Sequence, residues 1–149
     1  MDQNAEPVVT EEGSLADGVI AALQDKVDQP KIDAILKKLQ ANAQAYPANG
    51  LIISFVLFTK VQVMLKDGSK SFTGYGGGLA TPGGGPNFGD VYTDDFNKLC
   101  AETDGFVVIT TPVYLTVLFL DKDLSLLGHY QSGAISTAGA QFSGAGHWS

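Results

Sequence analysis

The sequence predicts a single, mainly β domain, a small barrel or a sandwich, preceded by one or two short helices. From Gly50 onward the apolar residues alternate with period 2, whereas the residues before it follow a helical period. Glycine-containing turns separate short strand-like runs at regular intervals, which is typical of all-β barrels and sandwiches. The 149 residues are enough for one hydrophobic core but not for two.

The first third of the chain is predicted to contain two parts. Residues 1–14 form an acidic, polar tail that we expect to be flexible. Residues 15–46 form a helical segment, with Ser14 as the expected N-cap of a first helix and Pro30 in the first turn of a second. Each helix has one apolar face. We expect these faces to pack on each other and on the β domain; a membrane-surface or export segment and a dimer contact are the alternatives.

The rest of the chain, residues 47–149, is predicted to form the β domain. Pro47 and the pair Asn49–Gly50 are expected to end the helical segment. Asp67–Gly68 lies between two strand-like runs, a sequence typical of a two-residue hairpin. Thr93 is expected to cap a short helix near residues 94–101. The predicted strands, seven or eight of them, cover residues 51–58, 61–65, 71–76, 88–92, 106–110, 113–120, 126–132 and 138–147.

Two of the predicted strands are apolar on both faces. In residues 113–120 one face carries Leu115 and Val117 and the other carries Leu118 and Leu120, and residues 51–58 show a similar pattern. A barrel strand that faces water should be polar on its outer side. Either the N-terminal helices cover this outer face, or an apolar surface stays exposed for a partner.

Charge and cysteine content exclude several classes of protein. The net charge of −7 and the isoelectric point near 4.5 argue against nucleic acid as a partner and against simple electrostatic docking to an anionic membrane. With Cys100 alone, an internal disulfide cannot form. The first residues do not resemble a signal peptide, and no apolar run is long enough to span a bilayer. We therefore expect either a mature chain or export by a non-Sec route.

No motif in the sequence indicates catalysis. The glycine stretch 74–85 lacks the Gly-Lys-Ser/Thr of a phosphate-binding loop, so we interpret it as β-turns or bulges where backbones approach closely. Asp94 and Asp95 would point about 100° apart on a helix and cannot form an acid/base pair by themselves. We expect them to stabilise the helix N-terminus. His129 and His147 have no metal-ligand spacing around them and are expected to be structural or surface residues.

The remaining nucleophile types also lack a catalytic setting. Cys100 has no histidine near it in the sequence and is expected to be a buried small hydrophobic residue. Ser136, Ser143 and Ser149 have no nucleophile-elbow context. The sequence therefore predicts no catalytic, cofactor-binding or metal-binding residue, no cofactor, and no enzyme.

A series of short motifs, in a fixed order from Tyr46 to Trp148, resembles the virulence-associated (VapA-like) protein family of secreted actinobacterial factors. No single motif is specific, but their order and spacing together are. The matching positions are Gly50–Ser54 and Val61; Gly77–Leu79 and Pro82–Gly83; Thr93, Asp95, Lys98 and Leu99; Tyr114–Leu115, Phe119, Asp121, Leu127–His129, Gln131, Gly133–Ala134 and Ser136; and Gly144, Gly146 and Trp148.

The resemblance implies a closed antiparallel eight-stranded β-barrel with Greek-key connections, with an interior filled by side chains and no ligand cavity. It also implies a secreted protein without catalytic residues, which perturbs phagosome maturation in part through host membrane lipid. Members of the family have a signal peptide and a largely unstructured segment before the barrel. This chain departs from that pattern because it has two predicted helices there.

Three functions follow as hypotheses. The first is a non-enzymatic virulence effector that binds host membrane lipid or a host protein through its surface, with binding to anionic vesicles that strengthens below about pH 5. The second is a small-barrel ligand carrier, or an isomerase or cyclase with a hydrophobic interior, and the third is a self-associating module. A large interior pocket with polar groups would favour the second hypothesis, and a packed interior would favour the first. In each case we expect Trp148 to pack as the anchor that closes the barrel.

Overall fold

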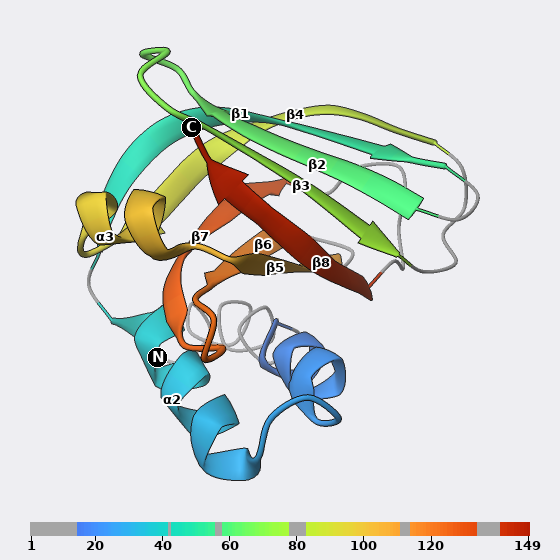
Figure 1. Ribbon diagram of the computed structural model, residues 1–149, viewed down its shortest axis with the longest axis vertical. Helices are drawn as coiled ribbons and strands as arrows, with labels where there is room; N and C mark the ends of the chain where they lie inside the picture. The colour runs from blue at the N-terminus through green and yellow to red at the C-terminus, as the bar shows by residue number, and fades with distance from the viewer. Residues whose placement is uncertain (1–14, 42, 56–57, 78–82, 111–113, 134–140) are drawn as a thin grey trace, which may run out of the picture.

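The computed structural model describes residues 15–41, 43–55, 58–77, 83–110, 114–133 and 141–149, which form a β-barrel with a helical segment packed outside it (Figure 1). Residues 15–23 are helical, followed by α2 (Gln29–Gln40), and α3 (Phe96–Glu102) lies between the fourth and fifth strands. The strands are β1 (Gln44–Ser54), β2 (Phe58–Leu65), β3 (Ser71–Gly77), β4 (Gly83–Thr93), β5 (Gly105–Thr110), β6 (Tyr114–Leu120), β7 (Leu126–Gly133) and β8 (Gln141–Trp148).

The eight strands close into one antiparallel barrel in the order β1-β2-β3-β8-β5-β6-β7-β4. Within this circle, β4-β1-β2-β3 and β8-β5-β6-β7 each show the 4-1-2-3 order of a Greek key. The two halves meet where β3 pairs with β8 and where β4 pairs with β7. The prediction of a closed eight-stranded Greek-key barrel is therefore confirmed.

The barrel interior is packed with branched and aromatic side chains, as expected for a small barrel. Trp148, on the last strand, is 7% exposed, and its ring centroid lies 5.2 Å from that of Phe119 and 5.7 Å from that of Phe72. Phe96 of α3 approaches the same indole at 6.1 Å. Trp148 therefore anchors this end of the barrel, as predicted.

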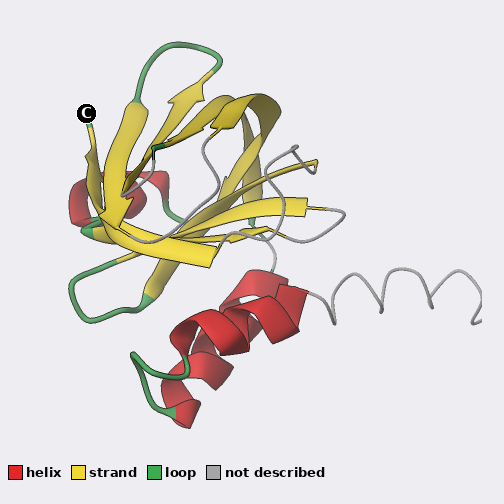
Figure 2. Cartoon of the chain, turned by 90° about the vertical axis from the view of Figure 1, so that its right-hand side faces the viewer, coloured by secondary structure: helices red, strands yellow, loops and turns green. Residues whose placement is uncertain are grey.

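The N-terminal helices lie against the outer face of the barrel (Figure 2), and a second hydrophobic core fills the contact between them. The helices contribute Val19, Leu23, Ile32 and Ile35, all of which are buried. On the barrel side the buried partners are Val107, Ile109, Leu118, Leu120 and Leu126. The expectation that the helices pack on each other and on the barrel is confirmed, and the apolar outer side of β6 is thereby covered.

The capping of α3 differs from the prediction. Asp95, not Thr93, is the N-cap: its Oδ1 accepts a hydrogen bond of 3.0 Å from the backbone N–H of Lys98. Thr93 is the last residue of β4, where its buried hydroxyl donates to the carbonyl oxygen of Leu127 at 2.8 Å. The same hydroxyl accepts from the Asp95 N–H at 3.2 Å, so Thr93 supports the turn that precedes the helix. Pro30 lies in the first turn of α2, as predicted.

The helical segment does not end at Pro47 and Asn49–Gly50, because all three residues lie inside β1, which begins at Gln44. Pro47 is paired with Asp90 of β4, and its carbonyl oxygen accepts a hydrogen bond of 2.9 Å from the Lys66 N–H. Gly50 is needed for close approach, since a Cβ there would collide with the side chains of Asn87 and Tyr130 inside the barrel. The glycine therefore marks a crowded interior position and not a turn.

The β2–β3 hairpin has Asp67–Gly68 at its tip, as predicted, but its connection runs from Lys66 to Lys70 and is longer than two residues. Gly68 has a φ of 78°, which favours glycine, and its N–H donates to the Leu65 carbonyl at 2.9 Å. Asp67 then accepts from the Ser69 N–H at 2.8 Å, and this hydrogen bond lowers the pKa of the Asp67 carboxyl. This additional Asp67–Ser69 turn lengthens the connection.

The glycine stretch 74–85 is mostly strand where the structure describes it. Gly74–Gly77 end β3 and Gly83–Gly85 begin β4, whereas residues 78–82 lie outside the described residues. Predictions that involve residues 1–14, Val113 and Ser136 also lie outside them. The division into a tail (1–14), a helical segment (15–46) and a barrel domain (47–149) stays a prediction. In the described part of the chain no helix combines the length and the hydropathy that crossing a bilayer requires.

Candidate binding surface

Large hydrophobic side chains are exposed on one side of the barrel. Phe88 of β4 is 67% exposed and Tyr75 of β3 is 54% exposed. The others in the described part of the chain are Phe55, directly after β1, and Phe58 and Met64 of β2. We call these five side chains, together with Leu51, Ile53 and Pro86 beside them, the apolar face.

The strand register brings these residues together. Met64 and Phe88 are paired with Asn49 of β1 from its two sides, which sets one end of the apolar face. At the other end the rings of Phe55 and Phe58 are stacked, with centroids 4.7 Å apart. Between these ends the paired outward residues are Leu51 with Pro86, and Lys60 with Ile53 and Tyr75.

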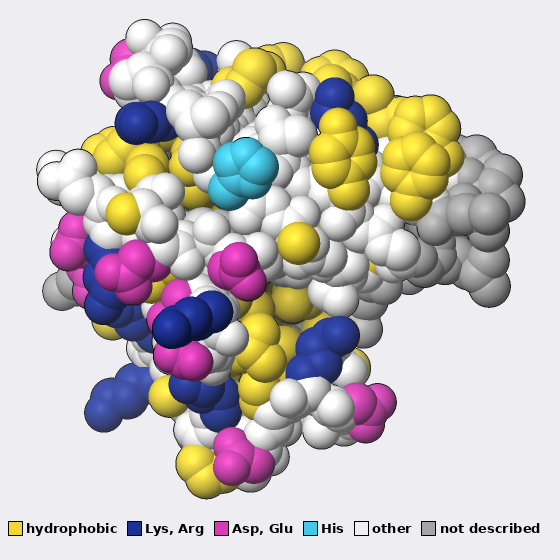
Figure 3. Space-filling view, viewed as in Figure 1, with side chains coloured by type: hydrophobic (Ala, Val, Ile, Leu, Met, Phe, Trp, Pro, Cys, Tyr) yellow, Lys and Arg dark blue, Asp and Glu magenta, His cyan; other side chains and the backbone are white. Residues whose placement is uncertain are grey.

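Lys60 is the one charged residue between the two ends of the apolar face. Its Nζ lies 6.0 Å from the centroid of the Tyr75 ring, and among the described residues it has no carboxylate within 4.0 Å. Asp90, the nearest carboxylate along β4, lies beyond Phe88 and is paired with Pro47. Figure 3 shows hydrophobic side chains gathered around a blue cationic group at the upper right of the molecule. The face thus combines exposed aromatic rings with a single positive charge.

The apolar face and the helical segment lie on opposite sides of the barrel. The strand order places β1 and β2 across the barrel from β5 and β6, whose outer side chains the helices bury. Both alternatives raised by the two-sided apolar strands are therefore found in the molecule, one on each side. The helices cover the strand at 114–120, and part of the run 51–58 stays exposed.

The two histidines lie apart from each other. His129 on β7 is largely buried, its ring is stacked on Tyr92 with centroids 5.1 Å apart, and burial lowers its pKa to about 4. His147 is exposed on β8 and is paired with Thr73. Both therefore occupy structural or surface positions, as expected. The described residues contain no group of three or more His, Cys, Asp or Glu side chains that could hold a metal ion.

The other candidate side chains have local structural roles. Cys100 on α3 is half-buried against the barrel core rather than fully buried as expected, and burial raises the pKa of its thiol. Ser143 lies in β8, paired with Gly77 of β3. Ser149 exchanges backbone hydrogen bonds with Ser71, at 2.8 and 2.9 Å.

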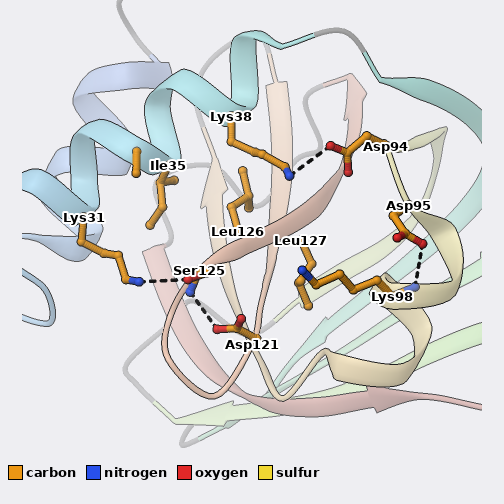
Figure 4. A pocket seen from close by; sticks show the side chains of 11 residues that line it. Lys31, Ile35, Lys38, Asp94, Asp95, Lys98, Asp121, Ser125, Leu126 and Leu127 are labelled. Atoms are coloured by element: carbon orange, nitrogen blue, oxygen red, sulfur yellow. Dashed lines mark hydrogen bonds and ion pairs between the residues drawn. The ribbon is translucent and has the colours of Figure 1, made fainter.

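A cavity of about 310 Å³ lies between α2 and the barrel (Figure 4). Two lysines of α2 reach across it: Lys31 donates to the Ser125 hydroxyl at 2.9 Å, and Lys38 forms an exposed ion pair with Asp94 at 3.1 Å. Asp121 accepts from the backbone N–H of Ser125 at 2.9 Å and so holds the β6–β7 turn. These polar groups are used in tethers and turns, so the cavity marks where the helical segment attaches to the barrel.

Sequence reasoning found the apolar face only in part. The two-sided pattern of residues 51–58 pointed to β1, but Tyr75 and Phe88 were not singled out. Both are lone aromatic residues among glycines and polar residues, so periodicity gave no signal for them. Only the register places them beside the other members of the face: β4 pairs with β1 and brings in Phe88, and β3 pairs with β2 and brings in Tyr75.

Comparison with known proteins places the chain in a family. The family described as Rhodococcus equi virulence-associated protein matches residues 5–149, a range that includes the helical segment. No match was found among curated proteins.

Two solved structures are similar to the barrel. Virulence-associated protein VapB from the intracellular pathogen Rhodococcus equi is 32% identical, with a TM-score of 0.67, over 72% of this chain and 98% of that one. Virulence-associated protein VapD from the same organism is 26% identical, also with a TM-score of 0.67, over 73% of this chain and 100% of that one. Together with the family match and the shared Greek-key barrel, these similarities show that the chain belongs to the Rhodococcus equi virulence-associated protein family.

Proposed function

We propose that the protein is a secreted, non-enzymatic virulence effector that acts by binding a host lipid membrane through its apolar face. The observation that carries the proposal is the group of five exposed large hydrophobic side chains on one side of the barrel. Contiguous apolar surface of this kind is typical of protein–protein or membrane interaction sites. Aromatic residues together with a lysine favour a membrane, because amphipathic rings and long cationic side chains suit its interface.

The free energy expected from burying the exposed side chains corresponds to weak and reversible binding. Each of the five side chains is roughly half exposed, so transfer into apolar surroundings would contribute about 1 kcal/mol apiece. The sum, about 5 kcal/mol, resembles the affinity that one myristoyl chain gives a protein. Membrane association would then depend on the lipid surface presented and on the charge of the protein.

The charge of the chain sets the expected pH dependence. With a net charge of −7, the protein is repelled by anionic vesicles near neutral pH. Protonation of carboxylates below about pH 5 reduces this repulsion, so binding to anionic vesicles should strengthen on acidification. Binding to neutral vesicles should change less, because the apolar transfer term does not depend on pH.

Vesicle co-sedimentation from about pH 7.5 to 4.5 tests the proposal, with neutral and anionic vesicles side by side. The double variant Phe58→Ser/Phe88→Ser should lose most of the binding, because it removes two exposed rings without opening the core. Ala21→Ser/Ala101→Ser, at exposed positions on the helices away from the apolar face, is the control and should bind like the unmodified protein. If no vesicle is bound at any pH, the membrane is not the partner and a host protein becomes the better hypothesis.

A further inference from the structure

Lys60 lies in the middle of the apolar face with aromatic rings on two sides. Tyr75 is its cross-strand partner, with the ring centroid 6.0 Å from Nζ. Phe58 lies two residues earlier on β2 and therefore on the same face, where it is stacked on Phe55. All three rings are exposed, and no described carboxylate pairs with the ammonium group. The site thus offers one cation that lies over the Tyr75 ring without a carboxylate partner among the described residues, together with exposed aromatic rings beside it.

These two kinds of group recognise two different charges. A lysine ammonium binds a phosphate as a point charge. The negative faces of aromatic rings attract quaternary ammonium groups, which carry little hydration. A ligand that presents a phosphate and a quaternary ammonium a few bonds apart would use both parts of the site at once.

We infer that Lys60, Tyr75 and the stacked pair Phe55–Phe58 form a recognition site for the phosphocholine headgroup of phosphatidylcholine in a bilayer. Lys60 contacts the phosphate, and the ring faces contact the trimethylammonium group. The inference rests on the proposed membrane binding and adds the headgroup that is recognised. A zwitterionic headgroup also fits a protein of net charge −7, since a neutral membrane does not repel it.

The test compares phosphatidylcholine with phosphatidylethanolamine vesicles of matched acyl chains at neutral pH. The two headgroups have the same phosphate and the same net charge, and they differ in the quaternary or primary ammonium. An exposed cation–π contact corresponds to about a 2- to 5-fold change in affinity, so we expect phosphatidylcholine to be preferred about 5-fold. Equal binding to the two lipids would overturn the headgroup inference and leave the proposed membrane binding intact.

Three variants separate the parts of the site. Tyr75→Leu keeps an apolar side chain but removes the ring face, so it should reduce the preference for phosphatidylcholine to about 2-fold or less. Phe88→Leu, at a more exposed aromatic position at the far end of the apolar face and outside the headgroup site, is the control: it should keep the preference for phosphatidylcholine, whatever its effect on binding to both lipids. Lys60→Met should weaken binding to both lipids alike, because both carry the phosphate. A preference that survives in Tyr75→Leu would also overturn the inference.

Free phosphocholine distinguishes a bilayer lipid from a soluble ligand. Binding measured by calorimetry should be far weaker for free phosphocholine than for the vesicles, because the surrounding apolar side chains then gain no burial. Equal affinity for both would assign the site to a soluble ligand instead. The absence of binding to either vesicle would overturn the headgroup inference; the proposed function would fall only if anionic vesicles were also not bound at any pH from about 7.5 to 4.5.

Discussion

The burial of His129 predicts a loss of stability on mild acidification. Its ring is stacked on Tyr92 and shares a recess with Lys38 and Asp94, beneath the link between α2 and β1. Burial lowers its pKa from 6.5 to about 4, which means that the folded state disfavours the charged imidazole. Because the unfolded chain takes up this proton first, the stabilisation is complete above pH 6.5 and is lost as the pH falls from 6.5 to 4.

The size of this loss of stability follows from the difference between the ordinary and the lowered pKa of His129. A pKa lowered by about 2.5 units, at about 1.4 kcal/mol per unit, corresponds to about 3 kcal/mol over the whole range. Of this, about 2 kcal/mol should be lost between pH 7 and pH 5. Carboxylates also titrate in acid, so the prediction concerns the difference between the unmodified protein and a variant without this imidazole.

The variant His129→Phe keeps an aromatic ring against Tyr92 and removes the titrating group. Urea unfolding at pH 7, 6 and 5, followed through the fluorescence of the single tryptophan, gives the free energy of unfolding for both proteins. The unmodified protein should lose about 2 kcal/mol more than the variant between pH 7 and pH 5. His147→Phe, on the exposed side of β8, reports what removal of a surface imidazole does. If the free energies of unfolding of the unmodified protein and of His129→Phe differ by the same amount at pH 7, 6 and 5, the reasoning is refuted.

Three further predictions concern packing and capping. Trp148→Ala should lower the free energy of unfolding by about 3–5 kcal/mol. Trp148→Phe should cost less, since the buried indole N–H has no hydrogen-bond partner among the described residues; equal losses in chemical denaturation would contradict this. Gly144→Ala should destabilise the barrel by about 1–3 kcal/mol or prevent folding, because the added Cβ collides with the Tyr75 carbonyl. Gly77→Ala on β3, where a Cβ meets nothing within 4 Å, is its control, and similar melting temperatures for the two variants would argue against the collision. Asp95→Ala should lower the stability by about 1 kcal/mol, because it removes the N-cap of α3. The adjacent Asp94→Ala removes only an exposed ion pair and should lower it less. A larger drop in melting temperature for Asp94→Ala than for Asp95→Ala would contradict this.

Alternating strands and local turns predicted a barrel or a sandwich, and the resemblance to the family supplied the closed eight-stranded barrel. Asp67–Gly68 illustrates this: Asp-Gly between two alternating runs indicates a hairpin tip, and the structure has the tip there, although the connection is longer than the predicted two residues. Trp148 was predicted as the anchor because a large aromatic ring on the strand that closes the barrel can bury much apolar area, and it is 7% exposed.

Errors arose where one residue type serves two purposes. The glycine of Asn49–Gly50 was interpreted as a turn former, but its small size is needed beside Asn87 and Tyr130. Thr93 and Asp95 are both good N-caps by residue type, and only the end of β4 decides between them. In each case the deciding contact is with a residue far away in the sequence: Asn87 and Tyr130 for Gly50, and the Leu127 carbonyl for Thr93.

The candidate site depended even more on long-range pairing. Apolar outer faces occur on β6 and on β1, and alternation alone cannot tell which one the helices cover. That choice is fixed by the fit of Val19, Leu23, Ile32 and Ile35 against β5 and β6. The exposed face can therefore be identified only when the strand pairing of the closed barrel and the position of the helices are known.

The two Greek keys have a consequence for assembly. Strands β1–β4 and β5–β8 follow one and the same order, and the connection between them runs through α3. If one half of a molecule pairs with the other half of a neighbour, every ladder is satisfied, including β3 with β8 and β4 with β7. The barrel thus has the connectivity for domain swapping, in which identical elements are exchanged between two chains. Refolding at high concentration should favour such dimers over monomers, and dilution alone should not separate them quickly, since exchange requires both barrels to open.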